Sequence, residues 1–342
     1  MKKTIIIRVL LVFAIFLLAS SFYYLPYYVS KPGMAKELEP IIEVEDGYDE
    51  VGNFMLTTVR MGRANIYSYI TAKLMDYVEL YPMEDIRVEN ETDEEYNIRQ
   101  LHLMDSSKTA AIEVAYKKAG VPVDYRYNGV YVLHVVPGMP AEGKLKAADR
   151  IFKVDDIEFN NSEEFIKYVS SLKAGDQISL AYERNNKIHH VSMNVEAFKD
   201  ADNKEKVGIG IGLVDDKEII VKPAVKVKTD EIGGPSAGFM FSLEIYNQLT
   251  ELDLTKGYEI AGTGTIATDG TVGKIGGIEQ KVIAADHAGA DIFLAPNENG
   301  AKDSNYQAAV LTAKDIGTDM KIIPINSFDE AVDYLEKLKQ KK

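Results

Sequence analysis

The stretch from Gly233 to Gly238, with the sequence GGPSAG, most constrains how this chain can fold. Its glycines permit a tight turn and the close approach of another backbone, while Pro235 fixes one backbone angle. The apolar residues 239–245 that follow predict a buried helix. Ser236 is therefore expected at the point where a loop enters a helix.

Ser236 is a candidate nucleophile. Unpaired amides at a helix start, together with the positive end of the helix dipole, stabilise the oxyanion of an acyl-transfer intermediate. We assign the nucleophile loop and this oxyanion role to Gly234, Pro235 and Ala237. A serine in this place is also a common helix cap, so the motif alone leaves both interpretations open.

A second glycine-rich stretch, residues 276–281, supplies a candidate base. Lys281 lies early in a predicted helix over Ile278–Ala288. Most lysines are solvated at the surface, but burial among small residues lowers the pKa of an amine, so that it can accept a proton from a serine. The small residues predicted on the face of Lys281 are Ala284, Ala285 and Ala288.

These residues resemble the proteolytic domain of the Lon family, in which a Gly-Pro-Ser-Ala-Gly loop carries the nucleophile and a Gly-Gly-(Ile/Leu)-(Lys/Glu)-(Glu/Gln)-Lys helix carries the base. The resemblance implies a serine endopeptidase with a Ser236–Lys281 dyad. It also implies a supporting hydroxyl from Thr263, although an ordinary strand threonine fits that position equally well. Three further segments resemble the family: residues 103–107, 224–228 and 262–266.

One position departs from the family pattern. Many members carry an aspartate three residues before the serine, where this chain has Gly233. The help of that carboxylate is therefore absent or comes from elsewhere, with Asp230 and Glu231 as candidates. Both are equally well explained as loop acids.

The segment between the two halves of the Lon-like region is longer than such a domain requires. From about residue 121 to 198 the sequence alternates as strands do, most clearly over 131–136 and 177–182. A short helix is predicted between these strands, over Ser162–Leu172. An inserted β-rich module is therefore expected.

The inserted module resembles a PDZ domain. Residues 140–145 are similar to the Pro-Ala pattern of that family and residues 148–156 to its Gly-Asp-Arg-Ile pattern, with Ala148 in place of the usual glycine. The resemblance implies a groove in which loop amides hold a peptide terminus and a strand accepts the peptide as an added strand. The carboxylate-binding loop is assigned to Asn128, Gly129, Val130 and Tyr131, and the apolar side of the groove to Phe165, Tyr168 and Val169. The alternative is that these apolar residues pack the core of the module.

The N-terminus predicts a membrane anchor. Lys2, Lys3 and Arg8 precede an uncharged run over residues 9–29, which as a helix would span roughly 30 Å, the thickness of a hydrocarbon core. Aromatic residues at its far end and the basic flank favour a single pass through the cell membrane over residues 5–29, with a cytoplasmic N-terminus and an extracellular body. A cleaved signal peptide, with residues 19–21 as its cleavage site, is the competing interpretation.

Composition excludes several classes of site. The chain has no cysteine, which excludes disulfides, thiolate catalysis and cysteine-based zinc sites. Its net charge of -14 disfavours nucleic acid as a partner. The histidines form no His-Glu-x-x-His pattern, and the residues around Lys274 lack the complete pattern of a P-loop. We therefore expect no cofactor, no metal and no ATP.

A second class of hydrolase also has to be weighed. Residues 234–238 fit the Gly-x-Ser-x-Gly elbow of α/β-hydrolases, whose serine, acid and histidine follow in that chain order. Only His287 follows Ser236, and on the predicted helix it faces away from Lys281. These positions disfavour a hydrolase triad.

The expected fold class is α+β, a Lon-type proteolytic domain interrupted by a PDZ-like β-rich module and preceded by one transmembrane helix. This is the arrangement of the membrane-anchored PDZ-Lon proteases, the YlbL-like and SepM-like family. The expected function is ATP-independent cleavage of peptides or flexible protein segments, with homo-oligomerisation an open question. A noncatalytic membrane scaffold that binds peptides is the alternative. The expected segments are the anchor over 1–30, a linker over 31–47, protease over 48–120, PDZ over 121–199 and protease over 200–342.

Overall fold

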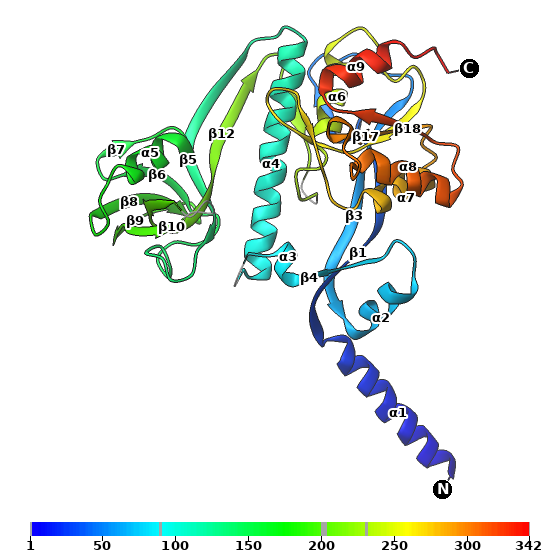
Figure 1. Ribbon diagram of the computed structural model, residues 1–342, viewed down its shortest axis with the longest axis horizontal. Coiled ribbons are helices and arrows are strands. Elements are labelled where there is room, and N and C mark those ends of the chain that lie inside the picture. Colours follow the sequence, from blue (N-terminus) through cyan, green and yellow to red (C-terminus); the bar gives the residue numbers. More distant parts are fainter. Residues whose placement is uncertain (1, 89–90, 200–203, 230–231, 342) are drawn as a thin grey trace.

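A six-stranded mixed sheet forms the centre of the body (Figure 1). The computed structural model describes residues 2–88, 91–199, 204–229 and 232–341. The strands lie in the order β18-β17-β14-β3-β1-β4, in which neighbours from β18 to β3 are parallel and β1 is antiparallel to both β3 and β4. Their bounds are β1 Tyr24–Glu37, β3 Asn53–Asn65, β4 Glu79–Pro82, β14 Glu259–Gly262, β17 Ile292–Pro296 and β18 Lys321–Ile325.

Helices cover both faces of this sheet because successive strand residues point to opposite sides. Phe54 and Leu56 on β3 join one core with α4 (Asp93–Lys118), α6 (Gly238–Leu249) and α9 (Phe328–Glu336). Met55, between them, joins the other core with α7 (Ile278–His287) and α8 (Asn305–Ile316). The two helices that carry the sequence motifs, α6 and α7, therefore pack against opposite faces of the sheet.

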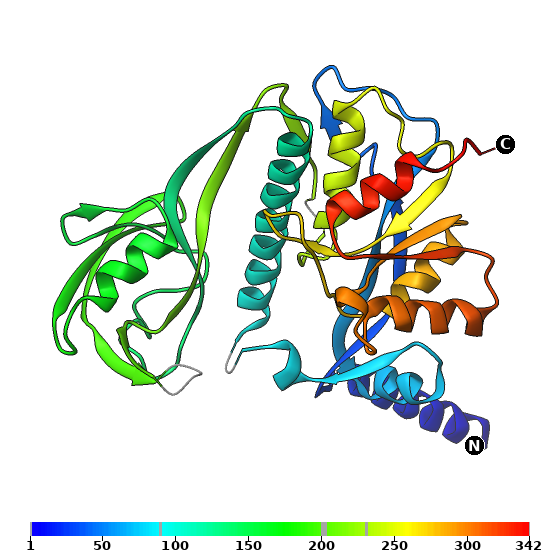
Figure 2. The same cartoon turned by 45° about the horizontal axis from the view of Figure 1, so that its top comes forward.

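The inserted module has its own sheet and its own core. Strands lie in the order β12-β5-β6-β8-β9, with β7 paired to β6 and the short helix α5 over Ser162–Ser170. Both views place α4 between this module and the body (Figures 1 and 2). The strand bounds are β5 Val123–Val135, β6 Arg150–Val154, β7 Ile157–Glu158, β8 Gln177–Arg184, β9 Lys187–Asn194 and β12 Ile211–Val221. A separate two-stranded antiparallel sheet consists of β10 Glu196–Lys199 and β11 Glu205–Gly208.

The module extends past residue 199, where the sequence placed its end. Strand β12 pairs with β5 along most of its length, and Ile209 lies in the same core as Val130. The pairing is nonlocal, so the local pattern of the chain did not reveal that β12 returns to the module. The remaining short elements are β2 Ile42–Val44 with β13 Val225–Val227, β15 Thr265–Ile266 with β16 Val272–Gly273, α2 Ile66–Leu74, α3 Met83–Ile86 and the 3-10 turn Glu298–Gly300.

The N-terminal segment differs from the expectation. Helix α1 covers Lys2–Ser21, and the chain then enters β1, so residues 24–29 are strand and not the end of a helix. Tyr28 and Val29 are buried there, as suits aromatic and β-branched residues between two neighbouring strands. The linker expected over 31–47 is likewise largely replaced by β1 and β2, which belong to the body. Among the described residues, no helix combines the length and apolar character that a membrane span requires.

Candidate active site

Ser236 lies immediately before α6, in a loop whose shape depends on glycine. Gly234 adopts a left-handed backbone with φ of 83°, which few other residues tolerate. A Cβ on Gly238 would lie 2.2 Å from Ser107 Oγ on α4, so only glycine lets α4 approach the start of α6. The loop is thus fixed by local backbone shape and by a neighbouring helix.

Lys281 lies in the first turns of α7 and is 2% exposed. Gly277 begins the helix in a left-handed conformation with φ of 68°. Ala284 and Ala285 are buried beside the lysine, as expected from the sequence, whereas Ala288 is exposed because it already caps the end of α7. The dry environment of the amine therefore comes from only part of the predicted alanine face.

The structure brings Ser236, Lys281 and Thr263 together. Lys281 Nζ lies 2.7 Å from Ser236 Oγ and 2.8 Å from Thr263 Oγ1. Thr263 is fully buried after β14, and its hydroxyl donates to the Ser236 carbonyl oxygen at 3.0 Å. Three residues from three separate segments thus form one hydrogen-bonded cluster.

The electrostatics of this cluster favour a neutral amine. Burial lowers the pKa of Lys281 to about 7, because the charged form of the amine loses its hydration. With Thr263 Oγ1 accepting one N–H, the lone pair of a neutral amine is free to face the serine hydroxyl. The geometry and the lowered pKa together give Lys281 the properties of a general base.

A cavity of about 550 Å³ opens at the cluster. Ser236 and Lys281 line it together with the edge of β3 and one face of α4. This volume falls in the range of small-ligand and peptide side-chain sites. The lining residues from those two elements are Leu56, Thr57, Thr58, Val59 and Met61 on β3 and Tyr96, Asn97, Gln100 and Met104 on α4.

The structure reduces the number of loop amides that are able to stabilise an oxyanion. The Gly234 amide donates to the Gln100 carbonyl oxygen at 2.9 Å, and Pro235 has no N–H, so these two residues of the assigned loop cannot donate to an oxyanion, which leaves Ala237. Among the hydrogen bonds of the described residues, the amides of Ser236 and Ala237 donate none. These two amides, at the positive end of α6, are the available donors.

Sequence reasoning missed Gln100 and gave Ser107 no role. Both lie on α4: Gln100 holds the Gly234 amide, and Ser107 Oγ donates to the Pro235 carbonyl oxygen at 2.8 Å. Ser107 lies in the segment 103–107 that resembles the Lon family, which was the available signal. No sequence signal marks Gln100, because its main-chain carbonyl makes the contact.

Two candidates for a supporting carboxylate, Asp230 and Glu231, lie outside the described residues. Gly233 itself packs against α4, where an added Cβ would lie 3.0 Å from Gln100 Cβ. A side chain at this position would require the loop and α4 to separate by a few tenths of an ångström. The close contact with α4 gives a steric reason for the glycine.

The peptide groove of the inserted module lies elsewhere than predicted. Asn128, Gly129, Val130 and Tyr131 are inside β5, where Val130 pairs with Asp215 of β12 and with Ile151 of β6. Both edges of β5 are therefore occupied there, and no peptide strand can be added at this loop. The prediction failed because β12, which covers that edge, was assigned to the protease segment.

An apolar cavity of about 560 Å³ lies instead between α5 and the start of β12. Phe165 and Val169 line it, as predicted, although both are almost fully buried and also pack in the module's core. The opposite wall is the glycine-rich stretch 207–211, and Leu213 extends it. This arrangement, a helix facing the start of a strand, is the geometry in which an extended peptide joins a sheet edge.

Comparison with protein families agrees with both parts of the structure. Residues 107–195 match the PDZ domain, and residues 190–337 match the Lon protease (S16) C-terminal proteolytic domain. The chain therefore carries a PDZ domain and a Lon-type proteolytic domain. Ser236, which precedes α6, and Lys281, which lies on α7, both fall inside the second match.

Several curated Lon proteases are similar to this chain. Those of Campylobacter concisus, Xanthomonas oryzae pv. oryzae and Mycoplasma mobile are 35%, 30% and 28% identical over 99, 130 and 187 residues. These alignments cover 29%, 38% and 53% of this chain but only 11%, 14% and 19% of the relatives. The chain thus spans less than a fifth of the length of these relatives.

Solved PDZ domains are also similar to part of this chain. The PDZ domain of an SdrC-like protein from Listeria monocytogenes is 38% identical, with a TM-score of 0.24. The alignment covers 26% of this chain and 90% of the Listeria chain. Its counterpart from Listeria innocua is 39% identical, with a TM-score of 0.23, over 25% of this chain and 92% of that chain.

Proposed function

We propose that this protein is a Lon-type serine endopeptidase in which Ser236 is the nucleophile and Lys281 the general base. The observation that carries the proposal is the 2.7 Å separation of Lys281 Nζ and Ser236 Oγ, with the amine buried. The matches to Lon proteolytic domains support the reaction class.

The first step of the reaction is acylation of the serine. Neutral Lys281 accepts the hydroxyl proton as Ser236 Oγ attacks the carbonyl carbon of a peptide bond, and the carbonyl oxygen becomes an oxyanion. The amides of Ser236 and Ala237 are placed to donate to that oxyanion. Lys281 then gives its proton to the departing amine, which leaves an ester on Ser236.

Water completes the cycle by the same groups. Lys281 accepts a proton from water, whose oxygen attacks the ester carbonyl, and the collapsing intermediate returns Ser236 Oγ to the hydroxyl form. Thr263 holds the amine throughout, because its hydroxyl donates to the Ser236 carbonyl and thereby presents its lone pairs to Lys281. Its role is to position the base.

The PDZ domain provides peptide selection in this proposal. The apolar cavity between α5 and β12 suits an extended peptide with an apolar side chain, and its glycine-rich wall lets a peptide backbone approach. Substrates are flexible segments or peptides, cleaved without ATP, since the sequence offers no P-loop to drive unfolding.

The proposal also includes a membrane anchor, as in the membrane-anchored PDZ-Lon proteases. Helix α1 begins with Lys2 and Lys3 and carries exposed apolar side chains such as Ile5, Leu10 and Leu18. The body would then face the exterior of the cell. Protease protection of a C-terminal tag in intact cells tests this: a tag that resists external protease contradicts the topology.

Peptide cleavage by the full chain in mild detergent, without nucleotide, tests the activity. The wild type is expected to cleave unstructured peptides and Ser236→Ala to leave them intact. Ser242→Ala is the matched control, because Ser242 lies nearby within α6 but donates to the Phe239 carbonyl oxygen and not to the dyad. Cleavage by purified Ser236→Ala, or a wild type inactive on every peptide, contradicts the proposal. Truncation at residue 30 is unsuitable, because it removes half of β1.

A further inference from the structure

Helix α2 turns its apolar residues away from the body. Tyr67, Ile70 and Leu74 lie on one face of the helix, and they are 37%, 52% and 80% exposed. All nine residues of the helix are described, and none of them is buried. A surface helix of a soluble domain normally directs such a stripe at the core. The outward stripe of α2 therefore indicates that another apolar phase covers it.

Helix α2 lies against the C-terminal end of α1. Tyr67 Oη donates to the Leu17 carbonyl oxygen at 3.0 Å. The residue that caps α2, Asn65, donates from Nδ2 to the Ser21 carbonyl oxygen at 3.1 Å. Both views show the two helices side by side at the base of the body (Figures 1 and 2). Whatever surrounds the end of α1 therefore also reaches α2.

The turn between α1 and β1 extends the same surface. Phe22, Tyr23 and Tyr24 are all exposed there, and exposed apolar side chains of α1, such as Leu11 and Leu18, precede them. Tyrosine has an apolar ring and a polar tip, and it is enriched where a bilayer meets water. The turn and α2 thus have the composition of a surface that lies at a membrane interface.

Positive charges border this surface. The Arg63 guanidinium lies over the Tyr24 ring, 5.2 Å from its centre, and approaches Asp93 only to 3.8 Å. Lys73 is exposed beside Leu74 at the end of α2. Basic side chains next to exposed apolar ones favour phosphate headgroups, whereas the chain as a whole carries a net charge of -14. This local charge favours lipid over another acidic copy of the chain.

We propose that α2 and the turn 22–24 lie in the headgroup region of the lipid bilayer that holds α1. The stripe of Tyr67, Ile70 and Leu74 then faces the acyl chains, at the depth of about 5–10 Å that is typical of interfacial helices. This placement rests on the membrane anchor of the proposed function. It requires no further protein, because the lipid around α1 also covers α2.

The second attachment would fix the orientation of the body. A single helix lets the body rotate about α1, whereas contact through α2 holds one side of it against the bilayer. Strand β1 starts at this surface with Tyr24, and Met34 and Lys36 near its other end line the catalytic cavity. The cavity is then kept at a constant height, and the substrates within its reach are flexible segments at that height above the bilayer.

Single-cysteine labelling of the full chain tests the placement, because the chain has no cysteine of its own. Leu74→Cys is labelled with nitrobenzoxadiazole in vesicles of phosphatidylcholine and phosphatidylglycerol, with and without doxyl-labelled lipid. Val51→Cys is the matched control, because Val51 is 74% exposed and precedes β3, whereas α2 follows the other end of that strand. We expect doxyl lipid to quench the label at position 74 at least about threefold more than the label at position 51.

Charged variants of α2 test the same contact by removing it. Ile70→Glu combined with Leu74→Glu should lower the quenching of a label at Met75→Cys at least about threefold, because carboxylates disfavour the acyl region. Ile157→Glu combined with Ile188→Glu adds the same charge to the inserted module and should change that quenching less than about 1.5-fold. All four replaced side chains are exposed, so the variants should fold, which thermal unfolding checks. Unchanged quenching in the α2 variant would overturn the placement.

A label on α1 separates this test from that of the anchor. Leu11→Cys, at an exposed position of α1, reports whether that helix enters the bilayer. Quenching at position 11 without quenching at position 74 would overturn the placement of α2 and leave the anchor standing. Quenching at position 74 alone would support α2 and remove the anchor, and quenching at neither would overturn both. Disulfide-linked dimers of unlabelled Leu74→Cys, together with an unquenched label, would assign the face to a second copy and overturn the placement.

Discussion

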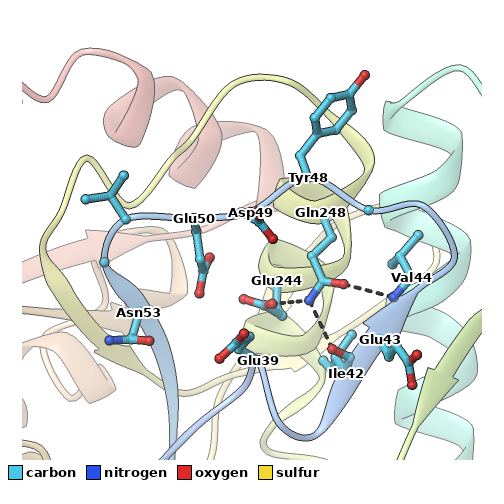
Figure 3. Close-up of a pocket in the computed structure, with 13 residues that line it drawn as sticks. Glu39, Ile42, Glu43, Val44, Tyr48, Asp49, Glu50, Asn53, Glu244 and Gln248 are labelled. Atoms are coloured by element: carbon cyan, nitrogen blue, oxygen red, sulfur yellow. Dashed lines mark hydrogen bonds between the residues drawn. The ribbon is translucent and has the colours of Figure 1, made fainter.

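Two buried ionisable groups, Lys281 of α7 and Glu244 of α6, lie at different positions along α6, and their surroundings differ. Lys281 lies against the start of the helix and contacts the hydroxyls of Ser236 and Thr263. Glu244, two turns further along, contacts Glu50, another acid (Figure 3). Burial favours the neutral form in both places. At the first site the amine contacts two hydroxyls, whereas at the second two carboxyl groups contact each other.

The difference also gives the two sites opposite pH dependence. The pKa of Lys281 falls from 10.5 to about 7 on folding, so the unfolded state binds more protons between these values and stability rises with pH across that window. The pKa of Glu50 rises from 4.5 to about 9, so the folded state binds more protons and stability falls as pH rises from 4.5 to about 9. Measurements on variants can therefore separate the two sites.

The largest expected effect is on catalysis at the first site. Lys281→Ala should lower kcat/KM by about 10³-fold or more, because the variant lacks the amine that contacts Ser236 Oγ and accepts its proton. Lys281→Arg should fail as well, since a guanidinium stays protonated. Lys274→Ala is the control, because Lys274 is exposed and bonds only Asp303. Near-normal peptide cleavage by Lys281→Ala would remove the proposed base.

The second effect is on stability at the same site. Lys281→Met should raise the free energy of unfolding near pH 7 by about 3 kcal/mol, because methionine avoids the free energy of burying an amine. The gain should shrink as pH rises toward 10.5, where the unfolded lysine also loses its proton. Urea unfolding at several pH values measures this. A gain that does not change with pH would show that Lys281 is not buried neutral.

The third effect concerns the hydroxyl that holds the amine. Thr263→Val keeps the shape of the side chain but removes the acceptor of the Lys281 amine, and we expect kcat/KM to fall about 30-fold. Thr263→Ser retains the hydroxyl and should stay within a few-fold of wild type. A positioning role also predicts a changed pH–rate profile in Thr263→Val. Equal activity of the two variants would reduce Thr263 to an ordinary strand residue.

The fourth effect is the pH profile of the wild type. Because burial lowers the pKa of Lys281 to about 7, kcat/KM should rise about fivefold between pH 6 and 7 and level off above pH 8. Initial rates at low substrate concentration measure this limb. A profile that rises only near pH 10 would place the amine in water.

How much of this could be predicted from sequence depends on how local each feature is. Ser236, Lys281 and the helices after them follow short motifs, so both the elements and the proximity of the two residues were predictable with the Lon resemblance. The buried face of Lys281 followed from Ala284 and Ala285, which helical spacing places beside it. Thr263 was predictable only through the resemblance.

Features that depend on nonlocal pairing were not predictable. From sequence alone, the start of β1 was interpreted as the end of an apolar helix, and β12 as part of the protease domain. In the structure β1 pairs with β3 and β4, and β12 pairs with β5. That second pairing moved the peptide groove from Asn128–Tyr131 to the start of β12. Likewise, Gln100 contacts the nucleophile loop through its main chain, which no side-chain pattern records.

The smallest expected effect is on thermal stability at the acidic pair of Glu50 and Glu244. Glu50→Gln removes a carboxyl group that folding must keep protonated, so the variant should unfold a few degrees higher than wild type near pH 8.5. Near pH 4.5 the difference should vanish, because Glu50 is then protonated in the folded state and holds much of its proton when unfolded. Asp49→Asn, an exposed acid of the cavity that Glu50 and Glu244 line, is the control.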